Sequence, residues 1–139
     1  MADVRPVTET FAVAPQLELE DFGDLKAMGF ERIINNRPDG ETENQPTSAE
    51  AEAAAKAVGL AYVHAPFVGR PTQEAIEAAA NAVGKTLAYC RSGTRSVTAW
   101  ALSQAKNGRM DADEIVQSAA RAGYNLSALK DALRHAGGR

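Results

Sequence analysis

The chain has 139 residues, enough for one domain with a buried hydrophobic core, and we expect residues 1–139 to form that single domain. Hydrophobic residues make up 45% and charged residues 24% of the chain, a composition that excludes a disordered protein. The formal net charge is −3 without a block of like charge, so we expect neither nucleic acid nor a membrane surface as a partner.

A single cysteine is present, which excludes an intramolecular disulfide and favours a reducing compartment. The first six residues lack the apolar core of a signal peptide, and no apolar run is long enough to span a membrane. The expected location is therefore the cytoplasm.

The first thirty residues contain a short apolar run at Phe11–Ala14, which predicts an edge strand because Pro15 follows it. An apolar face at helical spacing then predicts a helix over 18–28 that ends at Gly29. From residue 32 onward, strands and helices alternate. The predicted elements are a strand at 32–35, a helix at 47–58, a strand at 61–65, a helix at 73–83, a strand at 86–89, and helices at 96–106, 111–122 and 126–135.

This alternation predicts an α/β domain of three layers, in which helices flank a mainly parallel sheet. Ligands bind such sheets at the carboxyl ends of the strands. Two polar segments, Asn36–Glu41 and Cys90–Ser96, follow the strands at 32–35 and 86–89. We therefore expect both segments at one edge of the sheet, where they would form a site.

The segment Cys90-Arg91-Ser92-Gly93-Thr94-Arg95-Ser96 joins a predicted strand to a predicted helix. Amide groups of such a loop can form a concave anion-binding site, and the helix adds unpaired N–H groups and the positive end of its dipole. This environment favours the thiolate of a cysteine over the thiol. Cys90 is therefore the candidate nucleophile, and the simpler alternative is a buried structural thiol.

The other residues of the loop suit the same chemistry. Arg91 and Arg95 bring positive charge, and Arg95 is the second candidate catalytic residue because its guanidinium can grip an oxyanion with two nitrogens. Gly93 permits a backbone geometry that a side chain would hinder. Such a positive site in a mildly acidic protein indicates a small anionic substrate. Hydroxyl donors to the sulfur or to a bound anion would come from Ser92, Thr94 and Ser96.

A second polar cluster consists of Asn35, Asn36, Arg37, Asp39 and Glu41. One interpretation is a turn held by asparagine side chains, with Arg37 paired to Asp39 or Glu41. The other interpretation is a wall of the site, in which Arg37 or Asp39 orients the substrate. Neither His64 nor His135 has the spacing of metal ligands, so the sequence indicates no metal and no cofactor.

The loop at Tyr89–Ser96 resembles the active-site loop of rhodanese-type sulfurtransferases. The wider pattern, from Phe11 to Tyr124, is similar to a bacterial family of small tyrosine-phosphatase-like domains that are also found fused to metallo-β-lactamase-like hydrolases. The resemblance implies a tyrosine- or dual-specificity-phosphatase-like sheet and leaves the reaction open. Besides the loop, the matching segments are Ile33–Glu41, Gln45-Pro46, Gly59–His64 and Trp100-Ala101-Leu102.

Departures from the phosphatase pattern bear on the reaction. Four residues separate Cys90 from Arg95, whereas the cysteine phosphatases that this domain resembles have five, and rhodanese loops are of the shorter kind. Phosphatase relatives usually carry their general acid on the loop that corresponds to 66–72, which has no carboxylate here, although Asp39 is a possible substitute. Tyr89 also replaces the histidine that commonly precedes the phosphatase cysteine.

We therefore expect a cysteine-dependent sulfurtransferase, which passes a sulfane sulfur from thiosulfate or a low-molecular-weight persulfide through a persulfide on Cys90. The alternative is a cysteine-dependent phosphatase that hydrolyses a phosphoester through a phosphocysteine. A third hypothesis, from a different class, is a non-catalytic anion-binding module that keeps the loop without turnover.

Overall fold

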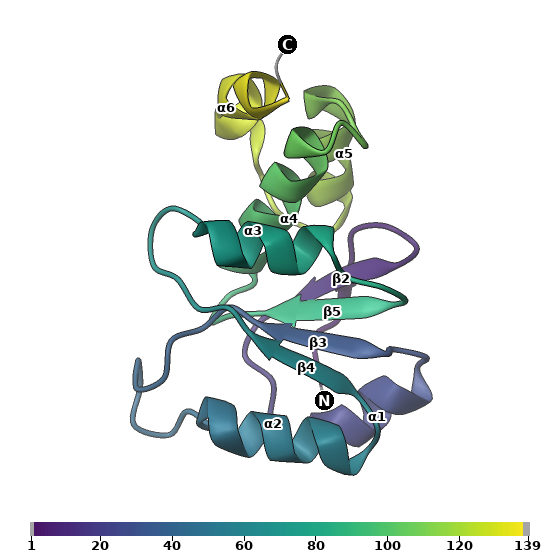
Figure 1. Ribbon diagram of the computed structural model, residues 1–139, viewed down its shortest axis with the longest axis vertical. Coiled ribbons are helices and arrows are strands. Elements are labelled where there is room, and N and C mark those ends of the chain that lie inside the picture. Colours follow the sequence, from purple (N-terminus) through teal and green to yellow (C-terminus); the bar gives the residue numbers. More distant parts are fainter. Residues whose placement is uncertain (1, 138–139) are drawn as a thin grey trace.

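A five-stranded sheet lies between two layers of helices in the computed structural model, which describes residues 2–137 (Figure 1). The strand order is β1-β2-β5-β3-β4, and only β1 runs antiparallel to its neighbour. The predicted α/β architecture with a mainly parallel sheet is confirmed. The strands are β1 (Arg5–Pro6), β2 (Phe11–Ala14), β3 (Arg32–Asn35), β4 (Ala61–His64) and β5 (Thr86–Tyr89).

The helices divide between the two faces of the sheet, as Figure 1 shows. On one face lie α1 (Asp21–Ala27) and α2 (Ser48–Ala57). The opposite face is covered by α3 and α4, with α5 and α6 stacked beyond them. These four helices are α3 (Gln73–Ala80), α4 (Thr94–Lys106), α5 (Ala112–Arg121) and α6 (Lys130–Ala136), and a 3-10 turn at Ser127–Leu129 precedes the last.

Two large hydrophobic cores fill the spaces between the layers, and a smaller cluster lies between α3 and α4. Because side chains alternate along a strand, neighbouring residues of one strand contribute to different cores. Ile33 and Leu87 pack with the buried residues of α1 and α2, whereas Ile34 and Ala88 pack with those of α4 and α5. Trp100 of α4 is 1% exposed, which identifies it as a core residue.

Several boundaries differ from those predicted. The first helix begins at Asp21, because the Asp21 carboxylate accepts a hydrogen bond from the Glu18 amide before the helix. The helix predicted at 73–83 ends at Ala80, and the helix predicted at 96–106 begins at Thr94. The second shift matters for the site, since it places residues 94–96 in the first turn of α4 rather than in the loop. Strand β1 was not predicted because two residues show no periodicity. It pairs with β2, so the predicted edge position of the strand at 11–14 is wrong, and β2 lies between β1 and β5.

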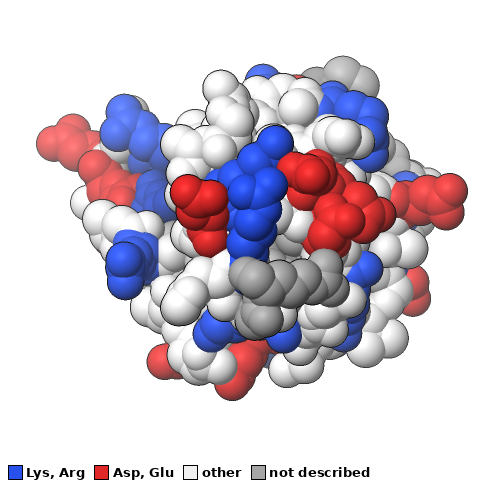
Figure 2. All heavy atoms as spheres, turned by 90° about the horizontal axis from the view of Figure 1, so that it is seen from above, with Lys and Arg blue, Asp and Glu red and all other residues white. Residues whose placement is uncertain are grey.

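The face that carries α5 and α6 mixes charges of both signs (Figure 2). Ion pairs join these helices, with Asp113 of α5 lying 3.1 Å from Lys130 and 3.6 Å from Arg134 of α6. Within residues 2–137, none of the helices combines the length and the apolar character needed to cross a membrane. The cytoplasmic location stays a prediction.

Candidate active site

Cys90 directly follows strand β5 at the carboxyl edge of the sheet. Its sulfur accepts a hydrogen bond from the amide of Gly93, with an N···Sγ distance of 3.1 Å. Gly93 is the residue before α4 and has a φ of 95°, in the left-handed region that favours glycine. The sulfur is therefore held at the N-terminal end of a 13-residue helix, where unpaired amides and the helix dipole favour negative charge.

No part of Cys90 is exposed to solvent. The residue is packed among the end of β5, the turn at Gly93 and the neighbouring strand β2, whose Ala14 carbonyl accepts a hydrogen bond from the Cys90 amide at 3.4 Å. A substrate can reach the sulfur only if groups around the site move. In this conformation, the burial of Cys90 also fits the alternative interpretation, in which it is a structural thiol.

The hydroxyl groups of the loop bond to other groups and not to the Cys90 sulfur. The Ser92 hydroxyl donates to Oγ1 of Thr94 at 3.1 Å and also accepts a hydrogen bond from the Thr94 amide. The Ser96 hydroxyl donates to Oδ1 of Asn36 at 2.8 Å, in a buried position. These contacts shape the loop, and the role of the hydroxyls as donors to the sulfur or to a bound anion stays a prediction.

Asn36 connects the site to three strands. Its amide donates to the carbonyl of Tyr89 at 2.8 Å, and its side-chain Nδ2 donates to the carbonyl of Ala65 at 2.9 Å. Its Oδ1 accepts from Ser96, as described above. All of these groups are buried, so leaving one unpaired would cost about 1–3 kcal/mol. Asn36 therefore fixes the first turn of α4 against the ends of β3, β4 and β5.

Arg95 is held by a carboxylate of this chain. Its two terminal nitrogens contact both oxygens of Glu41, with Nη1···Oε2 and Nη2···Oε1 distances of 3.0 and 2.8 Å. Nη1 also donates to the carbonyl of Phe67 at 3.2 Å. Hydrogen bonding with Glu41 raises the pKa of Arg95, and the nearby Cys90 sulfur contributes in the same direction. The two terminal nitrogens of Arg95, which were predicted to bind an oxyanion, thus lie near Cys90 and bind the Glu41 carboxylate.

Arg37 is buried and belongs to the same network. Its Nε donates to Oε1 of Glu41 at 2.8 Å, and its Nη1 donates to Oε1 of Gln16 at 2.9 Å. His64 contacts the carbonyl of Arg37 through Nε2 at 2.9 Å. The predicted pairing of Arg37 with a nearby carboxylate is confirmed, and the partner is Glu41. A role of Arg37 in orienting a substrate stays a prediction.

Asp39 is exposed and lies at the start of α2. Its Oδ1 accepts a hydrogen bond from the amide of Ser48 at 2.8 Å, which satisfies one of the unpaired amides of that helix. The contacts found for Asp39 join it to α2 and not to Cys90 or Arg95. Its predicted roles, as a binding residue or a substitute acid, stay predictions. Arg91 is exposed and makes no ion pair with another of the described residues, and its role in binding a substrate stays a prediction.

Glu41 is the residue whose importance the sequence did not reveal. Its hydrogen bonds with Arg95, followed by those with Arg37, lower the pKa of Glu41 to about 2. The carboxylate is therefore ionised at neutral pH and cannot donate a proton while both contacts hold. Its separation from Arg95 by 54 positions explains why no spacing rule could pair them.

Within residues 2–137, no three His, Cys, Asp or Glu side chains come together in a way that could hold a metal ion.

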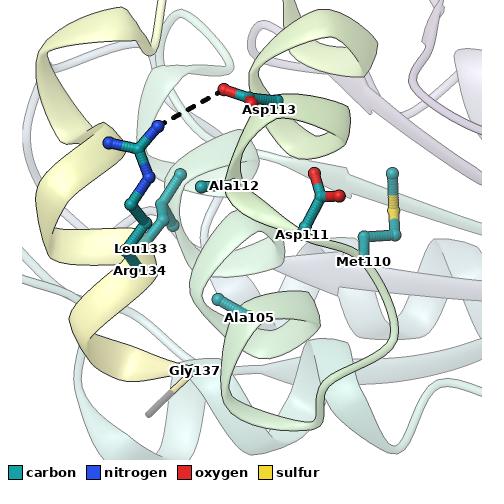
Figure 3. Close-up of a pocket in the computed structure, with 8 residues that line it drawn as sticks. All are labelled: Ala105, Met110, Asp111, Ala112, Asp113, Leu133, Arg134 and Gly137. Carbon is teal, nitrogen blue, oxygen red and sulfur yellow. Dashed lines mark ion pairs between the residues drawn. The ribbon is translucent and has the colours of Figure 1, made fainter. Parts of the chain in front are cut away.

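A separate hollow of about 210 Å³ lies at the other end of α4, where α5 and α6 meet (Figure 3). Asp111, Asp113 and Arg134 are among its lining residues, and none of the candidate site residues lines it.

Residues 3–107 match the family model described as "Beta-lactamase hydrolase-like protein, phosphatase-like domain". The chain is 38% identical over 125 residues to the beta-lactamase hydrolase-like protein of Xylella fastidiosa (strain Temecula1). It is 36% identical over 127 residues to the protein of that name from Agrobacterium fabrum (strain C58). These matches cover 86% and 88% of this chain but 29% and 30% of the relatives, so the chain spans about three tenths of their length.

Solved structures share the fold. A candidate phosphatase from Neisseria meningitidis Z2491 matches with a TM-score of 0.79 at 33% identity, covering 95% of this chain and 96% of that chain. PTPMT1 in complex with PI(5)P matches with a TM-score of 0.71 at 15% identity, covering 97% and 94%. Tk-PTP in its active form gives a TM-score of 0.70 at 15% identity, covering 98% and 97%. The expected likeness to tyrosine and dual-specificity phosphatase folds is confirmed.

The ionisation of Glu41 predicts a change of stability in acid. Because the pKa of Glu41 is about 2 in the folded protein and near 4.5 when unperturbed, its contacts stabilise the fold above pH 4.5, and this stabilisation is lost as the pH falls toward 2. The side chain is partly solvated, so we expect a contribution of about 1 kcal/mol.

Urea unfolding of the wild type and of Glu41→Gln, measured across this pH range, tests the prediction. The variant should be less stable above pH 4.5, and the difference should shrink toward pH 2. Glu43→Gln is the matched control, because Glu43 is an exposed carboxylate in the same loop. A difference between wild type and Glu41→Gln that stays constant with pH would contradict the role given to the Glu41 carboxylate.

Proposed function

This chain belongs to the family of phosphatase-like domains of beta-lactamase hydrolase-like proteins, and on that premise we propose that it is a cysteine-dependent phosphatase acting on small phosphoesters. The observation that carries the proposal is the position of the Cys90 sulfur. It accepts a hydrogen bond from the Gly93 amide at the start of α4, and the Arg95 guanidinium lies nearby. Family and fold favour phosphoester hydrolysis over the sulfur transfer expected from the loop alone, and none of the relatives named above is a rhodanese.

In the first step, the Cys90 thiolate attacks the phosphorus atom. A P–S bond forms, the P–O bond to the leaving group breaks, and the leaving oxygen departs with the electron pair. Amides at the start of α4 and the guanidinium of Arg95 would bind the phosphoryl oxygens, where negative charge is spread in the transition state. Water then attacks the phosphocysteine, and the P–S bond breaks with its electron pair on sulfur. The thiolate is restored, and the protons of the water stay on the released phosphate or pass to solvent.

The leaving group must depart with little help from a general acid. The loop at 66–72 contains no carboxylate, and Glu41 is ionised while Arg37 and Arg95 hold it. A Glu41 side chain displaced into solvent would return toward its ordinary pKa of 4.5 and would still be ionised at neutral pH. A positioned acid normally contributes about 10²–10⁴-fold to such a reaction. The proposed substrates are therefore phosphoesters whose leaving oxygen is already a weak base, such as aryl phosphates.

Substrate entry requires the closed site to open. Glu41 occupies both terminal nitrogens of Arg95, which are the groups that a phosphate would bind. A dianionic substrate would take the place of the Glu41 carboxylate, since both are oxyanions that fit the same fork. The Glu41 side chain is 23% exposed, so it can move into solvent without crossing the core.

Sulfur transfer is the second candidate, favoured by the four-residue spacing between Cys90 and Arg95 and by the missing acid. The thiolate would attack the outer sulfur of thiosulfate, forming an S–S bond while the S–S bond of the donor breaks and sulfite leaves with the electron pair. Cyanide would then remove the outer sulfur as thiocyanate and restore the thiolate. No proton is needed in either step, so an ionised Glu41 is no obstacle.

A paired assay separates the two reactions. Hydrolysis of a chromogenic aryl phosphate and transfer from thiosulfate to cyanide are measured on the same preparation, with Cys90→Ser as the control. We expect phosphate release that depends on Cys90 and falls steeply as the leaving group becomes more basic, because no acid protonates it.

Each other outcome changes the assignment. Thiocyanate formation without phosphate release would replace the phosphatase by the sulfurtransferase. Inactivity in both assays, together with ordinary reactivity of the thiol toward iodoacetamide, would indicate the anion-binding module. Activity that survives in Cys90→Ser would contradict both cysteine mechanisms.

The competition between Glu41 and the substrate gives a further prediction. Glu41→Gln removes the charge that occupies Arg95, so inorganic phosphate should protect Cys90 from alkylation at a concentration about fivefold lower than in the wild type. Glu43→Gln should leave the protection unchanged. Weaker protection in Glu41→Gln would show that Glu41 holds Arg95 in place for the anion and does not compete with it.

A further inference from the structure

One peptide group carries the hydrogen bond to the Cys90 sulfur. The amide N–H of Gly93 and the carbonyl of Ser92 belong to the same planar unit, and in a trans peptide they point in opposite directions. Whatever fixes the direction of the Ser92 carbonyl therefore also fixes the direction of the N–H that reaches the sulfur.

The backbone of Gly93 does not by itself fix the orientation of this peptide. Rotating its plane by about half a turn changes mainly ψ of the residue before it and φ of the residue after it. The residue after it is Gly93, and glycine accepts positive and negative φ about equally, so its φ of 95° is not enforced by its own chemistry. A reversed peptide would present a carbonyl oxygen to the sulfur, which would repel a thiolate.

Tyr124 holds the other end of the same peptide. Its hydroxyl donates to the Ser92 carbonyl oxygen at 2.9 Å. Tyr124 follows α5, and its amide donates to the carbonyl of Ala119 at 2.9 Å, so the ring is anchored by the end of that helix. Burial raises the pKa of Tyr124, which keeps the hydroxyl protonated and able to donate.

The fit around Tyr124 is tight. A Cβ atom placed on Gly93 would collide with the Tyr124 hydroxyl, so Gly93 is required for this close approach as well as for its backbone conformation. On the other side, the guanidinium of Arg5 lies over the Tyr124 ring, 5.3 Å from its centre. The ring is thus held between strand β1 and the loop that follows Cys90.

We propose that Tyr124 is a positioning residue for the nucleophile: its hydroxyl fixes the Ser92–Gly93 peptide so that the Gly93 N–H points at the Cys90 sulfur. The inference rests on the proposed function in that Cys90 must be the nucleophile. It adds a residue from outside the Cys90 loop, 32 positions away from Ser92.

Other charged and titratable groups also face Cys90 and must be kept constant in a test. Arg95 interacts with the sulfur, and its guanidinium is bound by Glu41. Tyr124 itself senses the charge of Cys90, and Arg5 lies over its ring. Tyr124→Phe removes only the hydroxyl and leaves Arg95, Glu41 and Arg5 in place, so the effect of the peptide can be isolated.

The test is the pH profile of Cys90 alkylation by iodoacetamide, followed by intact mass. The single cysteine of the chain makes the product unambiguous. Losing one oriented hydrogen bond to the thiolate should move the profile of Tyr124→Phe upward by about one pH unit relative to the wild type. Ser103→Ala is the matched control, because it also removes a buried hydroxyl that donates to a carbonyl, that of Trp100 in α4. Its profile should not move.

Amide hydrogen exchange at Gly93 gives a second measurement that does not depend on alkylation. Exchange should be faster in Tyr124→Phe, whereas thermal unfolding shows whether the variant is folded. Suppose that the wild-type alkylation profile lies at low pH and that the profile of Tyr124→Phe is the same. This result would overturn the role of Tyr124 and leave the proposed function intact. An ordinary thiol profile in both proteins would overturn the proposed function as well.

Discussion

The hydrogen bond from the Gly93 amide to the Cys90 sulfur is the interaction on which the account depends, because it joins the end of β5 to the beginning of α4. A strand that delivers a cysteine is common, and a helix that begins with a glycine is common as well. Placed three residues apart, they direct an amide and the positive end of a helix at one sulfur atom. The buried contacts of Asn36 hold the same turn against the neighbouring strands.

The second constraint is electrostatic. Arg95 and Arg37 share the carboxylate of Glu41, which gives the closed site an anion of its own. Without this carboxylate, two guanidiniums would lie near the edge of the sheet with fewer partners, and a buried charge left unpaired is costly. The carboxylate balances the charge of both guanidiniums, and under the proposed function its position marks where an incoming oxyanion would bind. In the same structure Cys90 is buried and Arg95 is bound by Glu41, so under the proposed function both would have to change when a substrate enters.

Much of the architecture follows from local sequence. The strands at 11–14, 32–35 and 86–89 have the predicted bounds, because short apolar runs between turn residues leave little choice. Cys90, Arg95 and Gly93 were identified as site residues since they lie within one loop. The start of α4 was placed two residues late, because sequence does not show that Gly93 adopts the left-handed conformation that begins the helix.

Contacts between distant segments could not be predicted. Glu41 reaches Arg95 across 54 positions, and Tyr124 reaches Ser92 across 32. Each looks like an ordinary surface or core residue in its own segment, and only the packing of β3 and α5 around the loop gives it a role. The hydroxyls of Ser92, Thr94 and Ser96 illustrate the converse: their residue types suit anion binding, but in this structure they bond to each other and to Asn36.

The most direct measurement of the central claim is the detection of a covalent intermediate. The protein is mixed with an aryl phosphate, quenched in acid within one turnover, and analysed by intact mass followed by peptide mapping. We expect a phosphoryl group on the peptide that contains Cys90, and no phosphoryl group on the corresponding peptide of Cys90→Ala. Steady turnover without any adduct on that peptide, or turnover that persists in Cys90→Ala, would contradict the account.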